Sequence, residues 1–194
     1  MRKTILSLMT IAVVISVVFA ACQDSAASEE KGIAMTKKEM VKRGGYLVNT
    51  IGCDDCHSPK RMGPNGPEII PELRLSGYPA SRPITKTNID VVKKGWMLLS
   101  DDLTTAVGSW GQSFAANLTS DVTGTGNWKE AQFIKAIREG KYKGLDNTRP
   151  LLMPMPWFVY RNLTDDDLKS IFAFLQTTKP VNNVVPSPKP FIQL

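Results

Sequence analysis

The chain has 194 residues, of which 42% are hydrophobic, and its formal net charge at pH 7 is +6. This length suits one domain, and no internal repeat is visible in the sequence. The basic residues occur in short pairs and one local cluster, whereas a nucleic-acid-binding protein typically has a strong basic stripe with interleaved aromatic residues. We therefore expect no nucleic-acid partner. The single histidine, His57, excludes metal ligation by two histidines of one chain.

Residues 1–21 have the pattern of a signal peptide. Arg2 and Lys3 are charged, residues 5–18 are mostly apolar, and the small residues before Cys22 resemble the lipobox of bacterial lipoproteins. The apolar run is too short for a committed membrane span. We expect an exported lipoprotein, acylated at Cys22 and anchored to a membrane facing the periplasm or the cell exterior. The alternative is ordinary cleavage that leaves a free thiol, which is a liability in an oxidising compartment.

Residues 22–35 are mostly small or polar, and we expect them to form a flexible tether ahead of a folded domain of residues 36–180. Thr36 and Glu39 have the spacing of a capping box, and apolar residues follow at helical intervals as far as Ile51, which predicts the first helix. The basic residues of this helix are Lys37, Lys38, Lys42 and Arg43. We interpret them as a solvated helix face, with a docking patch for an acidic partner as the alternative.

The sequence Cys53-Asp54-Asp55-Cys56-His57 is the CxxCH pattern that attaches a c-type haem. Two thiols at this spacing can each form a thioether with a haem vinyl group, and the adjacent histidine can then bind the iron. The alternatives are a redox disulfide and a zinc site, but a zinc site needs four ligands and only three are in reach. The motif therefore predicts one covalently attached haem c, held by Cys53, Cys56 and His57.

The stretch from His57 to Asn127 is rich in glycine and proline and shows little periodicity. Residues 96–100 and 103–107 are expected to pair as a small β-hairpin across the two aspartates between them. Asn117 begins an Asn-x-Thr sequence, which we interpret as loop chemistry rather than a glycan site.

Two more helices are expected after this stretch. The first begins at Asn127, with a glutamate three residues later, and ends at Gly140, a residue typical of helix ends. The second begins at Thr164, where three consecutive aspartates suit the positive end of a helix, and ends before Pro180. Residues 181–194 contain three prolines and predict an extended C-terminal tail.

Haem iron takes a second axial ligand, which is usually methionine in electron-carrying c haems. Met35 and Met40 precede the motif and belong to the tether or the first helix, and Met62 follows His57 too closely to reach the opposite face of the haem. The candidates that remain are Met97, Met153 and Met155. A backbone carbonyl is expected to accept a hydrogen bond from the other ring nitrogen of His57, and Pro67 is our candidate for it.

The chain resembles a bacterial class I cytochrome c at both ends of the expected domain. The resemblance covers GYLVNTIGCDDCHSPK around the haem motif, and then Leu151 to Trp157, Leu163 to Leu168 and Ala173 to Leu175. In that family a Met-Pro element is followed by a closing helix, and small residues in the first helix let the closing helix cross nearby. Gly44 and Gly45 match those small residues.

The resemblance implies a mostly α-helical cytochrome c fold, with three or more core helices around one haem. It also implies that Met155 is the axial ligand, with Met153 as the second choice. The segment from Gly63 to Gly126 is longer than in compact members and matches a subgroup of membrane-anchored cytochromes or haem subunits of dehydrogenases. Candidate neighbours of the haem propionates are Trp128, Arg149 and Trp157, with surface or core roles as the alternative.

We therefore expect a membrane-anchored, single-haem cytochrome that transfers one electron at a time and is not itself an enzyme. Its redox partners would be a dehydrogenase, an oxidase or other cytochromes. The alternatives are a haem enzyme, such as a small oxidoreductase or peroxidase, and a redox or gas sensor. Both would have a labile sixth ligand, so the methionine is the feature that separates them from a carrier.

Overall fold

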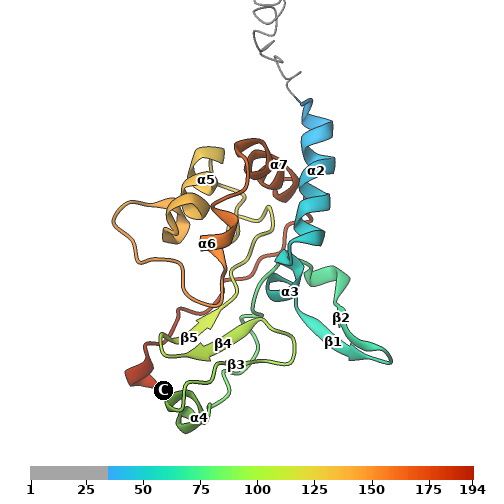
Figure 1. Ribbon diagram of the computed structural model, residues 1–194. Helices are drawn as coiled ribbons and strands as arrows, with labels where there is room; N and C mark the ends of the chain where they lie inside the picture. The colour runs from blue at the N-terminus through green and yellow to red at the C-terminus, as the bar shows by residue number, and fades with distance from the viewer. Residues whose placement is uncertain (1–34) are drawn as a thin grey trace, which may run out of the picture. The chain divides into compact units, whose positions relative to one another are not determined.

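The computed structural model describes residues 35–194 (Figure 1). The expected signal peptide, the lipidation residue Cys22 and all of the tether except Met35 lie outside these described residues. Within residues 35–194, no helix has the length and apolarity needed to cross a bilayer. The described part of the chain contains six α-helices, α2 to α7, and two small antiparallel sheets. Its regular structure is more helix than strand, which confirms the expected fold class in part, while the arrangement of core helices around a haem stays a prediction.

The first helix, α2 (Lys37–Thr50), begins as the capping box predicts. The backbone N–H of Glu39 donates to the hydroxyl of Thr36 at 3.3 Å, and the backbone N–H of Thr36 donates to the Glu39 carboxylate at 2.8 Å. These bonds satisfy N–H groups that would otherwise lack a partner at the helix end. Of the basic residues on this helix, Lys37, Lys38 and Lys42 are exposed, whereas Arg43 pairs with a carboxylate of the last helix.

The last helix, α7 (Asp165–Leu175), packs directly against α2 (Figure 1). Its N-cap is Thr164, as expected, whose hydroxyl accepts from the backbone N–H of Asp167. A Cβ atom on Gly44 of α2 would overlap the backbone carbonyl oxygen of Ser170. Gly44 is therefore a position where the two helix backbones meet, and only the absence of a side chain allows this approach.

The hydrophobic core joins α2 and α7 to α5 (Glu130–Glu139). Its buried members are Leu47, Val48, Leu75, Phe133, Ile137, Leu168, Ile171, Phe172 and Leu175. The rings of Phe133 and Phe172 lie with their centroids 5.5 Å apart. Burying one such side chain contributes about 1.5–3 kcal/mol, so this cluster stabilises the contact between the three predicted helices.

The start predicted for α5 is wrong by one turn. Asn127 and Glu130 have the spacing of a capping box, but the helix begins at Glu130 and its N-cap residue, Lys129, makes no side-chain cap. Residues 125–128 form a turn instead, in which the N–H of Trp128 donates to the carbonyl of Thr125 at 3.0 Å. The end is as expected, because Gly140 has the left-handed φ of +63° that closes a helix.

The remaining elements lie in the glycine- and proline-rich stretches. The short helices are α3 (Cys53–His57), α4 (Ile89–Lys93) and α6 (Trp157–Tyr160). Strands β1 (Lys60–Gly63) and β2 (Gly66–Ile69) form one hairpin, and β3 (Leu98–Leu99), β4 (Thr105–Gly108) and β5 (Gly111–Phe114) form a sheet in that order. The expected pairing across the two aspartates is confirmed, with Leu98 opposite Val107 and Leu99 opposite Ala106. The third strand, β5, and the β1–β2 hairpin were not expected from the sequence.

The loop of residues 115–128 lies beside the start of the C-terminal segment, residues 178–183, and hydrogen bonds join the two. Asn117 is buried, and its side chain donates to the carbonyl of Val181 at 2.8 Å and accepts from the backbone of Thr119 at 3.0 Å. Asn117 therefore has the loop role that we expected. Further along, Lys189 and Gln112 of β5 exchange two backbone hydrogen bonds, of 2.8 and 3.0 Å.

Candidate functional site

The CxxCH motif forms its own short helix, α3, directly after α2. Gly52 separates the two helices with a φ of +85°, a left-handed conformation in which glycine is favoured. Cys53 and Cys56 are three residues apart on α3, and such residues lie on the same helix face. His57 is the last residue of α3. The local fold thus presents both thiols in one direction next to the histidine.

Both thiols are in surroundings that disfavour their charged form. Cys53 is partly buried against the hydrophobic core. Burial, helped by the nearby charges of Asp54 and Asp55, raises the pKa of Cys53 to about 12, and burial also raises the pKa of Cys56. Catalytic CxxC disulfide pairs have a lowered thiol pKa, because their reaction needs the thiolate. The surroundings of Cys53 and Cys56 therefore do not match those of a thiol–disulfide exchange site.

The ring of His57 is held by one short hydrogen bond. Its Nδ1 lies 2.7 Å from the backbone carbonyl oxygen of Ala116. A carbonyl only accepts, so Nδ1 must carry the proton, and Nε2 is left with its lone pair for a metal. Burial also lowers the pKa of His57, which favours the neutral ring that metal ligation needs.

The acceptor predicted for His57 is therefore wrong. Pro67 lies in β2, opposite Met62 in the β1–β2 hairpin, while the acceptor is Ala116. Ala116 follows His57 by 59 positions. A backbone carbonyl has no side-chain signature, and the loop that carries it reaches His57 only through the tertiary fold.

The methionine candidates differ in their exposure. Met155 is partly buried and packs against the same core cluster as Cys53. Met153 is 41% exposed, Met97 is 43% exposed and Met62 is 68% exposed. A thioether that ligates iron must be withdrawn from solvent, so the packing of Met155 suits this role better than that of the other three.

The segment after Met155 is tied to the end of α2. Tyr160, in α6, donates its hydroxyl hydrogen bond to the backbone carbonyl of Ile51, two residues before Cys53. Burial, followed by the proximity of Cys53 and Cys56, raises the pKa of Tyr160 to about 12. This partly buried hydroxyl stays protonated at ordinary pH and links the methionine segment to the start of the motif.

The aspartate inside the motif has a structural role that the sequence did not reveal. Asp54 is buried and accepts a hydrogen bond from Ser58 at 2.6 Å and from Arg74 at 2.7 Å. Lys60 donates to the backbone carbonyls of Asp54, Asp55 and Ser58, at 3.2, 2.6 and 2.9 Å. These are carbonyls at the C-terminal end of α3, where a cation is stabilising. The helix that carries the thiols is therefore held through the Asp54 side chain and through the backbone carbonyls at its C-terminal end.

The expected propionate neighbours lie in different settings. Trp128 is partly buried against the core, and Trp157 packs on Gly140, where a Cβ atom would come within 2.6 Å of the indole. Arg149 lies 4.0 Å from the ring centroid of Tyr142, and burial lowers the pKa of its guanidinium. Arg149 is the one cation among the three, and it is partly buried, so a nearby anionic group such as a propionate would stabilise its charge.

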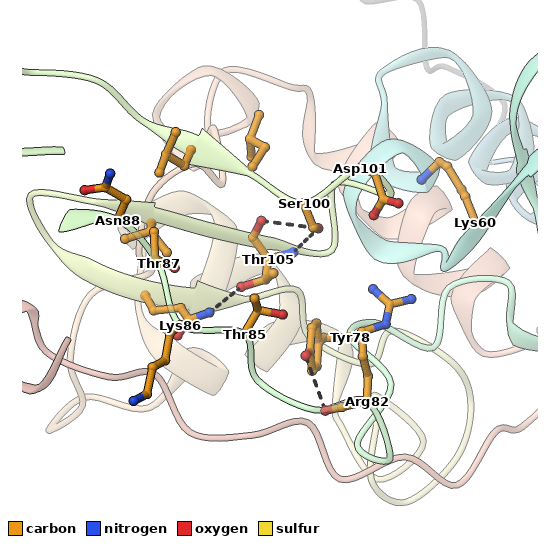
Figure 2. Close-up of a pocket in the computed structure, with 14 residues that line it drawn as sticks. Lys60, Tyr78, Arg82, Thr85, Lys86, Thr87, Asn88, Ser100, Asp101 and Thr105 are labelled. Atoms are coloured by element: carbon orange, nitrogen blue, oxygen red, sulfur yellow. Dashed lines mark hydrogen bonds between the residues drawn. The ribbon is translucent and has the colours of Figure 1, made fainter. Parts of the chain in front are cut away.

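A separate cavity of about 710 Å³ lies beside the three-stranded sheet. Figure 2 shows Lys60 and Asp101 at one end of it, and Lys86 and Asn88 at the other. Tyr78 also lines it and donates to the carbonyl of Pro83 at 3.1 Å. The cavity meets the motif region only at Lys60, whose amine caps α3.

Comparison with known proteins finds similarity to cytochrome subunits. The chain is 30% identical to a fructose dehydrogenase cytochrome subunit of Gluconobacter japonicus over 159 residues, which are 80% of this chain and 24% of that protein. It is 28% identical to a gluconate 2-dehydrogenase cytochrome c subunit of Pantoea cypripedii over 183 residues, which are 93% of this chain and 30% of that protein. One of the subunits of a nicotinate dehydrogenase of Pseudomonas putida is 33% identical over 79 residues, or 40% of this chain and 6% of that protein.

The chain spans less than a third of the length of these relatives, and no family model matches it. Two of the relatives are cytochrome subunits of dehydrogenases by name, and the similarity to them covers most of this chain. The similarity to these cytochrome subunits agrees with the haem-attachment motif that α3 carries.

Proposed function

We propose that this protein is a c-type cytochrome that carries one covalently attached haem and transfers single electrons. The observation that carries the proposal is the state of His57 within the CxxCH helix. Its Nδ1 is committed to the carbonyl of Ala116 at 2.7 Å, which leaves Nε2 for iron beside two uncharged thiols. Cys53 and Cys56 would form the thioether bonds to the haem.

The residues around the CxxCH helix are suited to hold a covalently attached haem. His57 and Met155 would be the axial ligands, because Met155 is the methionine that packs with Cys53 against the core. A bound haem supplies a reversible one-electron couple between ferrous and ferric iron. His57 would bind the iron and orient the haem, the Met155 thioether would favour the ferrous form, and the core residues that pack against Met155 would keep water from it. Arg149 would neutralise a propionate.

We further propose a dehydrogenase as the redox partner. The named relatives are subunits of fructose, gluconate and nicotinate dehydrogenases, which supports a role as the electron-accepting component of such a complex. In this role the chain is an electron carrier and not the catalytic subunit. The sequence pattern of residues 1–22 supports export and anchoring through an acylated Cys22.

The haem proposal is tested by expression with a cytochrome c maturation system and export. We expect haem that stays with the denatured polypeptide, in a ratio of one haem to one chain. The reduced pyridine complex should have the spectrum of a haem with both vinyl groups saturated. Haem that extracts into acidic organic solvent, or a chain without haem, would refute the proposal.

Carbon monoxide then separates a carrier from the two alternatives. A haem ligated by His57 and Met155 should bind carbon monoxide poorly, whereas an enzyme or a gas sensor with an open sixth position should bind it readily. For the anchor, Cys22→Ser should release haem-loaded protein into the soluble fraction or leave the signal peptide uncleaved. A processed variant that remains in the membrane would contradict acylation.

A further inference from the structure

The side chain of Asn183, in the extended C-terminal segment, holds three backbone groups of a distant loop. Its Nδ2 donates to the carbonyls of Ser76 at 2.7 Å and Tyr78 at 2.9 Å. Its Oδ1 accepts from the backbone N–H of Ala80 at 2.8 Å. The side-chain amide of Asn183 thus both donates and accepts hydrogen bonds. Its partners lie more than a hundred positions away in the sequence.

The loop that Asn183 holds lies between His57 and its hydrogen-bond acceptor. The N–H of Gly77 donates to the carbonyl of His57 at 2.8 Å, and the N–H of Tyr78 donates to the carbonyl of Ala115 at 2.9 Å. Gly77 has a φ of +76°, and a Cβ atom there would come within 2.6 Å of the backbone of Ala116. Residues 76–78 therefore fix the spacing between His57 and the carbonyl of Ala116.

The same C-terminal segment also holds the acceptor loop from its other side. The side chain of Asn117 donates to the carbonyl of Val181 at 2.8 Å. The N–H of Asn183 donates to the hydroxyl of Thr123 at 3.0 Å. The backbone of Asn183 thus binds the loop that follows Ala116, while its side chain binds the loop next to His57.

We propose that Asn183 is a positioning residue for His57, which sets the direction and strength of the hydrogen bond from Nδ1 to Ala116 and thereby the reduction potential of the haem. The inference rests on the proposed function, since His57 must ligate iron for the potential to respond. A strong Nδ1–H hydrogen bond makes imidazole a better electron donor to the metal, which stabilises ferric iron. Loosening this bond raises the potential.

The test compares Asn183→Ala with Asn182→Ala in the haem-loaded protein. Asn182 is the adjacent, exposed asparagine, so its replacement controls for changes in the segment as a whole. We expect Asn183→Ala to raise the reduction potential by up to about 59 mV, which is a tenfold rise in the ferrous-to-ferric ratio for a one-electron couple. The Nδ1 proton of His57, followed by NMR, should exchange faster with solvent. The control should change neither quantity.

A second variant keeps the test decisive if the alanine variant folds poorly. Asn183→Gln keeps an uncharged amide but displaces it by one methylene group from the carbonyls of Ser76 and Tyr78, so it should also raise the potential and speed the exchange. Variants that are only less stable, with an unchanged potential and proton exchange, would show a structural role and overturn the inference. An equal shift in Asn182→Ala would overturn it too. Failure of the proposed function is distinct, because the wild-type chain would then lack covalent haem.

Discussion

The carboxylate of Asp54, between the two cysteines of the motif, lies 2.7 Å from the guanidinium of Arg74. Asp54 is buried, and its other hydrogen-bond donor is the hydroxyl of Ser58 at 2.6 Å. The hydroxyl of Ser58 also accepts from the backbone N–H of Leu75 at 2.8 Å. This set of contacts fastens α3 to the loop that follows β2, so that the thiols and His57 are held on a helix with little freedom to move.

Replacing Arg74 with methionine should lower the free energy of unfolding by about 2–4 kcal/mol, because a buried carboxylate then loses its cation. Urea unfolding of the haem-loaded protein measures the loss. Lys93→Met is the matched control, since Lys93 pairs with Asp90 at 3.3 Å where both side chains are exposed. Such exposed pairs contribute about 0–1 kcal/mol. Equal losses in the two variants would mean that the Asp54 pair does not hold α3.

Gly44→Ala should destabilise the protein by about 2–4 kcal/mol, because the new methyl group would force α2 and α7 apart at Ser170. Gly45→Ala is the control on the same helix. There the Cβ atom would lie 3.1 Å from the ring of Phe174, which can shift, so the cost should stay below about 1 kcal/mol. Urea unfolding of both variants gives the comparison, and a Gly44→Ala variant as stable as Gly45→Ala would contradict the close crossing.

The sequence predicts those parts of the fold that have a local cause. The helices at Thr36 and Thr164 have a cap residue and a periodic apolar face, and both are confirmed. The start of α5 is mispredicted because Asn127 and Glu130 imitate a capping box, whereas Thr125 holds this segment in a turn. Local spacing cannot tell which of two competing hydrogen bonds the backbone will form.

The same distinction between local and distant causes applies to the candidate haem site. The CxxCH motif is a local pattern, so its residues and their order on α3 could be named from the sequence. The contacts that orient it come from distant segments through backbone atoms, as with the carbonyl of Ala116, or through side chains in irregular loops, as with Arg74 and Asn183. None of these residues stands out in composition or periodicity, and only the folded chain brings them to α3.

The stability of the loop after β3 should depend on pH through Asp102. Burial raises the pKa of this carboxyl, but hydrogen bonds from Ser100, Arg82 and Thr104 outweigh it and hold the pKa below its ordinary value. Arg82 lies 2.7 Å from the carboxylate. Because the folded pKa is lowered, the stabilisation is full above the unfolded pKa of about 3.9 and is lost as the pH falls through the folded pKa.

We therefore expect the free energy of unfolding to fall from about pH 4 downward, and to fall less steeply in Asp102→Asn. The variant should already be less stable at pH 7, because it lacks the ion pair with Arg82. Urea unfolding at a series of pH values measures both effects. Asp90→Asn, at an exposed carboxylate, should leave the curve unchanged. An Asp102→Asn curve parallel to that of the wild type would contradict the prediction.

Met155→Ala should leave the haem covalently attached, because Cys53, Cys56 and His57 are intact. It should abolish the weak long-wavelength sulfur-to-iron band of the ferric protein and lower the reduction potential, since a thioether favours ferrous iron. It should also allow carbon monoxide to bind. Visible spectroscopy and a redox titration measure all three effects.

Met153→Ala is the matched control, because Met153 is two residues away and also precedes a proline, but is 41% exposed. Its loss should change neither the band nor the potential, and should cost less than about 1 kcal/mol because the side chain is exposed and lies outside the core cluster. Spectra that respond to Met153→Ala and ignore Met155→Ala would assign the ligand to Met153. If both variants keep the band, the ligand is another residue, with Met97 next to be tested. A wild-type protein that has no band and binds carbon monoxide would favour an enzyme or a sensor over an electron carrier.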